Sequence, residues 1–129
     1  MIITSLNAIT GTDRDVSGPG WKSRRLLLAD DGMGYTMTDT LVLDGAELEL
    51  EYKNHLEACY CISGRGEVTN LATGETHVIE PFTLYALDKN DHHKLRAVGG
   101  DLRLVCVFNP PLTGGEVHRA DGSYALPES

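Results

Sequence analysis

Apolar and polar residues alternate in short runs along most of this chain. Successive side chains of an extended strand point to opposite faces, so a period of two predicts a strand with one buried face. Residues that favour turns separate the runs, as at Asp44-Gly45 and Asn90-Asp91. The pattern predicts strands at residues 24–28, 35–42, 47–52, 57–63, 66–71, 77–79, 83–87, 93–98 and 102–108.

No stretch of about twelve residues carries the apolar stripe of a helix, so the pattern predicts an all-β fold. Many short strands at this spacing are typical of a sandwich or a barrel. A chain of 129 residues is long enough for one hydrophobic core, and no linker or repeat divides it. We therefore predict a single domain over residues 1–129, with an irregular tail from 109 to 129 that covers the mouth of the barrel.

Composition narrows the choice of partners. The net charge is −8 and the pI is near 4.9, so the chain lacks the surplus of lysine and arginine that nucleic acid or an anionic membrane requires. Residues 1–5 show neither the basic start nor the apolar core of a secretory signal. The cysteines Cys59, Cys61 and Cys106 form no zinc-ribbon pattern. We expect a cytoplasmic protein with reduced thiols that acts on a small molecule.

Polar residues also occupy strand faces that a barrel would turn inward. Period two places Glu57, Cys59 and Cys61 on one face of their strand. The same spacing groups further residues on shared faces: Trp21, Ser23 and Arg25; Thr38 and Thr40; Tyr85 and Leu87; His93 and Leu95; Cys106 and Phe108. A polar interior is costly unless it is hydrogen-bonded, metal-bound or filled by ligand, so these faces indicate a site.

Each of these residues also has an ordinary structural explanation. Glu57 could face solvent, as most strand glutamates do. Tyr85 could be a core tyrosine with its hydroxyl bonded to backbone, and His93 could cap a turn. Cysteines are often small buried hydrophobes, and for Cys106 a packing role and a substrate contact are both open.

One spacing resembles a known superfamily. Glu57 precedes Gly64 by the spacing E-x6-G, and a later stretch leads through Pro81 into a strand. These segments resemble the two signature motifs of the cupins, whose strand glutamate binds a metal and whose glycine makes a hairpin turn. The resemblance implies a small, jelly-roll-like β-barrel. The chain departs from it at residues 51–53, where cupins carry two histidines, and at Phe82, where they carry glycine.

Four longer stretches carry a more specific resemblance: residues 20–28 (GWKSRRLLL), 52–58 (YKNHLEA), 85–89 (YALDK) and 105–114 (VCVFNPPLTG). In this order they resemble ectoine synthase, and the similarity runs from about residue 10 to the end. The resemblance implies a homodimer and a metal, usually Fe(2+), held by Glu57, Tyr85 and His93. It also implies residues that contact the substrate: Trp21, Ser23, Arg25, Thr38, Thr40, Cys106 and Phe108. The catalytic candidates that go with them are Glu116, His118 and Tyr52. Relatives often carry asparagine at position 38, so Thr38 is a departure.

The implied reaction suits such residues. In this family the α-amine of N-γ-acetyl-L-2,4-diaminobutyrate attacks its own amide carbonyl, and the ring loses water to give ectoine. The carbonyl must be polarised, protons must move to and from nitrogen and oxygen, and the chain must fold back on itself. Two alternatives stay open: a cupin dioxygenase that uses iron and O₂, and a cupin that binds a ligand without turnover. Neither accounts for the stretches at residues 20–28 and 105–114.

Overall fold

The computed structural model describes residues 1–115, which form ten strands, one short helix and a 3-10 turn. The helix is α1 (Leu6–Ile9) and the turn spans Ala29–Asp31. The strands are β1 (Asp15–Gly18), β2 (Trp21–Leu27), β3 (Thr36–Val42), β4 (Glu47–Leu50), β5 (Leu56–Ser63), β6 (Gly66–Asn70), β7 (Thr76–Ile79), β8 (Leu84–Leu87), β9 (His93–Ala97) and β10 (Leu102–Asn109).

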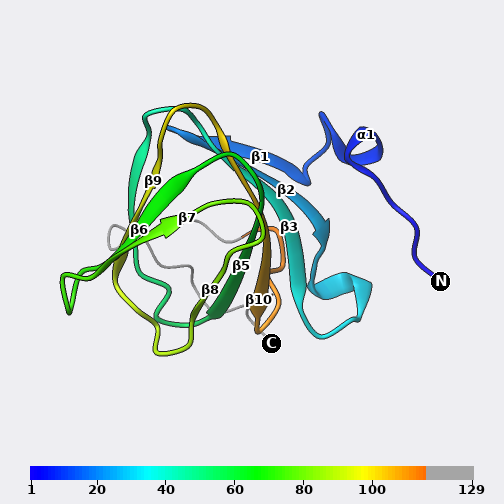
Figure 1. The fold of residues 1–129 in the computed structure, drawn as a ribbon. Coiled ribbons are helices and arrows are strands. Elements are labelled where there is room, and N and C mark those ends of the chain that lie inside the picture. Colours follow the sequence, from blue (N-terminus) through cyan, green and yellow to red (C-terminus); the bar gives the residue numbers. More distant parts are fainter. Residues whose placement is uncertain (116–129) are drawn as a thin grey trace.

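The strands form two antiparallel sheets that curve around a common interior (Figure 1). The larger sheet has the order β1-β2-β3-β10-β5-β8, and the smaller has the order β4-β9-β6-β7. Strands distant in sequence therefore become neighbours, since β10 lies between β3 and β5. The prediction of an all-β barrel is confirmed. Within residues 1–115, no helix has the length and hydropathy of a membrane span.

The inner faces of both sheets make the core. Val42, Leu102 and Cys61 are fully buried in the larger sheet, and Ile79 and Ala97 are 1% exposed in the smaller one. Along these strands the buried and more exposed positions alternate, as in the pattern BiBiBiBe of β10 (buried, intermediate, exposed). The period of two that the sequence shows is thus the period at which side chains enter the barrel.

An ion-pair group stands on the outer face of the larger sheet. The carboxylate of Asp39 on β3 accepts hydrogen bonds from Arg24 on β2 and from Arg103 on β10. Its side chain is 8% exposed. Burial alone would raise the pKa of Asp39, but hydrogen bonds from Arg103 and Arg24 outweigh it and hold the pKa below its usual range. The group ties three neighbouring strands together from outside.

All nine strands predicted from the sequence are present, with ends shifted by a few residues. The sequence reading missed β1, which contains a single apolar residue, Val16, and is held by pairing to β2. It also missed α1, whose four residues are too few to show a helical period. Ser5 caps this helix, because its side chain accepts a hydrogen bond from the Ala8 N–H.

Two turn positions show how local geometry sets the sheet. Gly64, the glycine of the E-x6-G spacing, has φ +84°, and a Cβ there would overlap the carbonyl oxygen of Asp101. Only glycine suits both the left-handed backbone and the lack of room for a side chain. Phe82, where cupins carry glycine, takes φ 75° and donates its N–H to the Cys61 carbonyl. Strand β8 keeps its pairing with β5, so the substitution is absorbed in the phenylalanine backbone and does not disturb the pairing.

The tail begins as an ordered segment. Leu112 is 1% exposed, its N–H donates to Thr36 Oγ1 at 2.7 Å, and its carbonyl accepts from the Ala29 N–H at 2.7 Å. These contacts anchor the start of the tail beside β2 and β3. Residues 116–129, with Glu116 and His118, lie outside the described residues, and so does the predicted covering of the mouth.

Candidate active site

A pocket opens between the two sheets of the barrel. Eight of its lining residues are predicted metal-binding, substrate-binding or catalytic residues: Trp21, Ser23, Thr40, Tyr52, Glu57, Tyr85, Cys106 and Phe108. The rest are Cys59 and apolar side chains: Val42, Leu48, Leu50, Leu95 and Leu104. Residues from seven strands therefore meet in one concave site.

Strand register explains why they meet. Reading across the larger sheet, Arg25 pairs with Thr38, Thr38 with Cys106, Cys106 with Cys59, and Cys59 with Tyr85. These five residues form a single row that crosses β2, β3, β10, β5 and β8. Facing residues in adjacent strands lie about 5 Å apart, so the row is a continuous polar band on the inner wall. Thr38 Oγ1 also lies 2.8 Å from Thr40 Oγ1.

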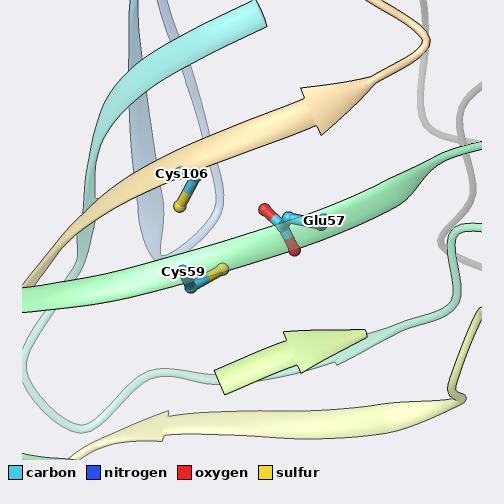
Figure 2. A group of neighbouring side chains, drawn as sticks. All are labelled: Glu57, Cys59 and Cys106. Atoms are coloured by element: carbon cyan, nitrogen blue, oxygen red, sulfur yellow. The ribbon is translucent and has the colours of Figure 1, made fainter. Parts of the chain in front are cut away.

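Glu57 lies two residues from Cys59 along β5, on the same inner face and beside this row (Figure 2). A carboxylate oxygen of Glu57 and the sulfur atoms of Cys59 and Cys106 all lie within 4.8 Å of one another. Burial raises the pKa of Glu57 to about 7, although hydrogen bonds with the Cys59 and Cys106 thiols lower it in part. A buried carboxylate whose hydrogen bonds come from thiols would gain from a metal cation, because the cation stabilises its charged form.

Tyr85 faces the same region from β8, directly opposite Cys59. Burial raises the pKa of Tyr85 well above 10, and the negative forms of Cys59 and Glu57 raise it further. The phenol is therefore neutral unless a metal cation compensates for the charge of the phenolate.

His93 is buried at the start of β9, and with Tyr85 it lines a second hollow. Its Nδ1 lies 2.9 Å from the Asp91 carbonyl oxygen, which can only accept, so Nδ1 carries the proton. Burial lowers the pKa of His93, so the ring is neutral. Its Nε2 is buried without a hydrogen-bond partner among the described residues. A neutral imidazole that is oriented by a carbonyl, with a free Nε2 lone pair, has the form of a metal ligand.

Arg25 is a second buried group with unused hydrogen-bonding capacity. The side chain is 2% exposed, Nη1 donates to the Gly114 carbonyl at 3.3 Å, and Nε has no partner within the described part of the chain. A buried guanidinium needs an anion or several acceptors. Its donors match the carboxylate of an amino-acid substrate.

Aromatic rings form one wall of the pocket. Tyr52 and Phe108 meet edge to face, with ring centroids 5.4 Å apart. The rings of His55 and Phe108 also meet edge to face, with their centroids 6.3 Å apart. The carbonyls of Tyr52 and His55 both accept from the Asn90 side chain, which fixes the loop before β5. The sequence predicts Asn90 only as a turn residue and leaves the role of His55, which lies just before Glu57, undecided.

Cys59 is a further residue to which the sequence assigned no role in the site. It was treated as a small buried hydrophobe, yet its sulfur belongs to the group around Glu57. The signal was present, since period two places Cys59 on the face of Glu57. What the sequence did not show was that Cys106 of β10 would stand directly opposite.

Comparison with known proteins agrees with this geometry. The family model described as ectoine synthase matches residues 1–128. The chain belongs to the ectoine synthase family. The L-ectoine synthase of Desulfosudis oleivorans is 53% identical over 99% of this chain and 99% of its own length. That of Desulfatibacillum aliphaticivorans is 56% identical over 98% of each chain. Ectoine synthases are hydro-lyases, so the chain is an enzyme of that class.

Solved structures place the family within a wider fold. The crystal structure of ectoine synthase from P. lautus matches with a TM-score of 0.88 at 50% identity, covering 100% of this chain and 94% of that one. KdgF from Halomonas sp. matches with a TM-score of 0.63 at 18% identity, over 74% of this chain and 83% of that one. A cupin domain of a transcriptional regulator from Enterobacter cloacae matches with a TM-score of 0.61 at 17% identity, over 71% of this chain and 98% of that one. These distant likenesses show the cupin fold.

Proposed function

We propose that the pocket converts N-γ-acetyl-L-2,4-diaminobutyrate to ectoine and water, in a cytoplasmic pathway that makes a compatible solute under osmotic stress. The α-amine nitrogen forms a bond to the amide carbon, and the amide oxygen leaves as water. Membership of the ectoine synthase family supports the reaction. The polar row from Arg25 to Tyr85 assigns this reaction to the pocket. Two buried nitrogen atoms, Arg25 Nε and His93 Nε2, have no hydrogen-bond partner among the described residues and are available to a substrate or a metal.

We infer that Glu57, Tyr85 and His93 hold Fe(2+). The fit rests on the raised pKa of the Glu57 carboxyl, the free Nε2 of His93 and a phenol that needs a cation to ionise. Carboxylate, phenolate and imidazole are hard to borderline ligands that suit iron. When bound, the ion would supply a Lewis acid that polarises the amide carbonyl.

A second donor set overlaps this one. Glu57, Cys59 and Cys106 bring two sulfur atoms and a carboxylate together, and such soft ligands favour zinc. We favour the first set because it accounts for the free Nε2 of His93, which the second leaves unused. Metal analysis of His93→Ala separates them: the iron content falls if His93 is a ligand and is unchanged if the sulfur set binds the metal.

The remaining residues position the substrate and move protons. Arg25 binds the substrate carboxylate through its unused donors, and this fixes one end of a flexible chain. Trp21 and Phe108 exclude water from the reacting groups, while a further set supplies polar contacts to the substrate: Ser23, Thr38, Thr40 and Cys106. Holding the amine and the amide together contributes up to about 7–11 kcal/mol to lowering the barrier.

Proton transfer needs groups that both accept and donate. Tyr52 lines the pocket and is 5% exposed, so its hydroxyl is one candidate among the described residues. Glu116 and His118 remain candidates from the part of the tail outside the described residues. Removing each in turn and measuring kcat at several pH values distinguishes a proton carrier from a residue that only binds substrate.

We also propose that the enzyme works as a homodimer. Large apolar side chains are exposed at the N-terminal arm, where Ile3 is 86% exposed, and on β8, where Leu84 is 61% exposed. Strand β8 is an edge of the larger sheet, and exposed apolar edges are usually covered. Leu84→Lys should therefore lower the molecular mass found by analytical ultracentrifugation to that of one chain. Met33→Lys, at a side chain 50% exposed elsewhere, is the control that should leave the mass unchanged.

The decisive experiment is turnover under anaerobic conditions. Purified, iron-loaded protein is incubated with N-γ-acetyl-L-2,4-diaminobutyrate, and ectoine is measured by chromatography beside Glu57→Ala and Glu75→Ala. Glu75 is an exposed glutamate outside the pocket, so its variant should keep full activity. Ectoine that disappears with Glu57→Ala or a chelator supports the proposal. Ectoine that survives both rules out the metal site, and no ectoine from the wild-type enzyme rules out the reaction. Turnover without O₂ also separates the enzyme from a dioxygenase.

A further inference from the structure

Two of the three cysteines face each other across adjacent strands inside the pocket. Cys59 on β5 is the register partner of Cys106 on β10, and both side chains point inward and are buried. Their sulfur atoms lie within 4.8 Å of each other, and all three cysteines are free thiols. Figure 2 shows Cys106 pointing from β10 toward β5, which carries Cys59 and Glu57.

The hydrogen-bond pattern of β5 defines the geometry of this pair. The N–H of Cys61 donates to the Thr83 carbonyl and the Cys61 carbonyl accepts from the Phe82 N–H, so the Cys61 backbone faces β8. Backbone groups two residues apart in a strand face the same neighbour, so those of Cys59 also face β8. Cys59 and Cys106 therefore form a non-hydrogen-bonded pair. Such pairs have the closer spacing, with Cα atoms about 4.5 Å apart.

This spacing suits a disulfide. The bond requires Cα atoms about 4.4–6.8 Å apart and Cβ atoms about 3.5–4.5 Å apart, which facing residues of an antiparallel pair approach without backbone movement. Rotation of the two χ1 angles then brings the sulfur atoms together. Cys61 is a natural contrast, because its register partner is Leu104 and its thiol contacts the Ser63 and Gly64 carbonyls.

We propose that Cys59 and Cys106 form a reversible disulfide that switches the enzyme off under oxidising conditions. An S–S bond forms, two S–H bonds break, and two electrons and two protons pass to an oxidant such as a peroxide, which becomes water, or a diazene, which becomes a hydrazine. The cross-link removes the thiols beside Glu57 and takes Cys106 away from the substrate. The pocket supplies the route by which a small oxidant reaches these buried thiols. The loss of activity rests on the proposed function, whereas the cross-link itself does not.

The test treats the iron-loaded, full-length enzyme with the diazene oxidant diamide, removes the reagent, unfolds the protein in acid and counts thiols. We expect the wild-type thiol count to fall from three to one, with a single chain on gels and a peptide that joins Cys59 to Cys106. Cys61→Ser should fall from two thiols to none, and Cys59→Ala should keep both of its thiols. Ectoine formation should fall with the cross-link and recover with dithiothreitol, while any activity that Cys59→Ala retains should resist diamide.

Three results would overturn the proposal. They are a wild-type count that stays at three, a cross-link that involves Cys61 or a second chain, and a complete Cys59–Cys106 cross-link with unchanged turnover. The thiol count needs only the wild-type protein, so a variant that fails to fold does not remove the test. A cross-link that forms in an enzyme whose reduced form makes no ectoine contradicts the proposed function and the switch, but leaves the disulfide established.

Discussion

The ion-pair group of Asp39, Arg24 and Arg103 stabilises the strands that carry the site, and its contribution can be measured. Asp39 on β3 receives hydrogen bonds from Arg24 on β2 and from Arg103 on β10, with Arg103 Nη2 2.6 Å from Oδ2. The inner faces of these three strands carry Arg25, the threonines and Cys106. Asp39→Asn keeps the size of the side chain and one acceptor oxygen, but it removes the charge on which both ion pairs depend.

The expected loss follows from the burial of each partner. A hydrogen bond to a charged group contributes about 1.5–3 kcal/mol and a neutral one about 0.5–1.5 kcal/mol, so a buried pair loses about 1–1.5 kcal/mol. Arg24 is 16% exposed and loses that full amount. Arg103 is 38% exposed and regains water, so its loss is nearer 0.5 kcal/mol. We therefore expect Asp39→Asn to lower the free energy of unfolding by about 2 kcal/mol near pH 7.

The lowered pKa of Asp39 sets how this contribution to stability changes with pH. The folded protein holds the pKa of Asp39 below its unfolded value of about 3.9, so this stability is present above that value and is lost as pH falls through the folded pKa. In urea titrations at fixed protein concentration, the gap between wild type and Asp39→Asn should be constant from about pH 7 to 5 and shrink below about pH 4. The exposed Asp13→Asn is the control. A gap that is absent at pH 7, or undiminished near pH 3, would refute the reasoning.

Three shorter predictions concern the site and its supports. Arg25→Lys should lower kcat/KM about 10- to 100-fold, mainly through KM, because one ammonium cannot replace the guanidinium fork; an unchanged KM in steady-state assays would contradict this role. Phe82→Gly should raise the free energy of unfolding by about 1 kcal/mol, because it relieves a left-handed backbone, and a lower urea midpoint would count against this. Gly64→Ala should lower it by at least about 2 kcal/mol, since its Cβ meets the Asp101 carbonyl; a midpoint within error of wild type would show that the hairpin adapts.

The strands could be predicted because the sequence carries their period directly. Each of the nine has enough apolar residues at alternate positions, and turn residues such as those around Gly64 separate them. Strand β1 has only Val16 as an apolar residue, and its existence depends on the edge of β2 that it joins. Edge strands of this kind are fixed by a partner, which a local pattern does not contain.

The site was predictable by face but not by register. Period two placed Glu57 and Cys59 on one face, and the family resemblance added Tyr85 and His93. A shift of one residue in the pairing of β5 with β10 would turn the inner face outward, and a shift of two would place a different residue opposite Cys59. The turns and packing that set the register act between strands far apart in the sequence. The facing pair Cys59–Cys106 therefore emerged only from the structure.

The registers also explain how one small barrel supports both a stable core and a polar pocket. Across β3, β10 and β5 the rows of paired inner residues gain polar groups from one end of the sheet to the other. The rows are Val42 beside Leu102; then Thr40, Leu104 and Cys61; then Thr38, Cys106 and Cys59; then Thr36, Phe108 and Glu57. Val42, Leu102, Leu104 and Cys61 are at most 1% exposed, while the Thr38 row continues on β2 to Arg25, whose Nε has no partner within the described residues. Because the same strands run through both regions, the packing of Leu102 and Leu104 fixes where Cys106 stands. Rigidity at the apolar end is thus what positions the polar groups, and this explains how five strands can present a single aligned row to a small substrate.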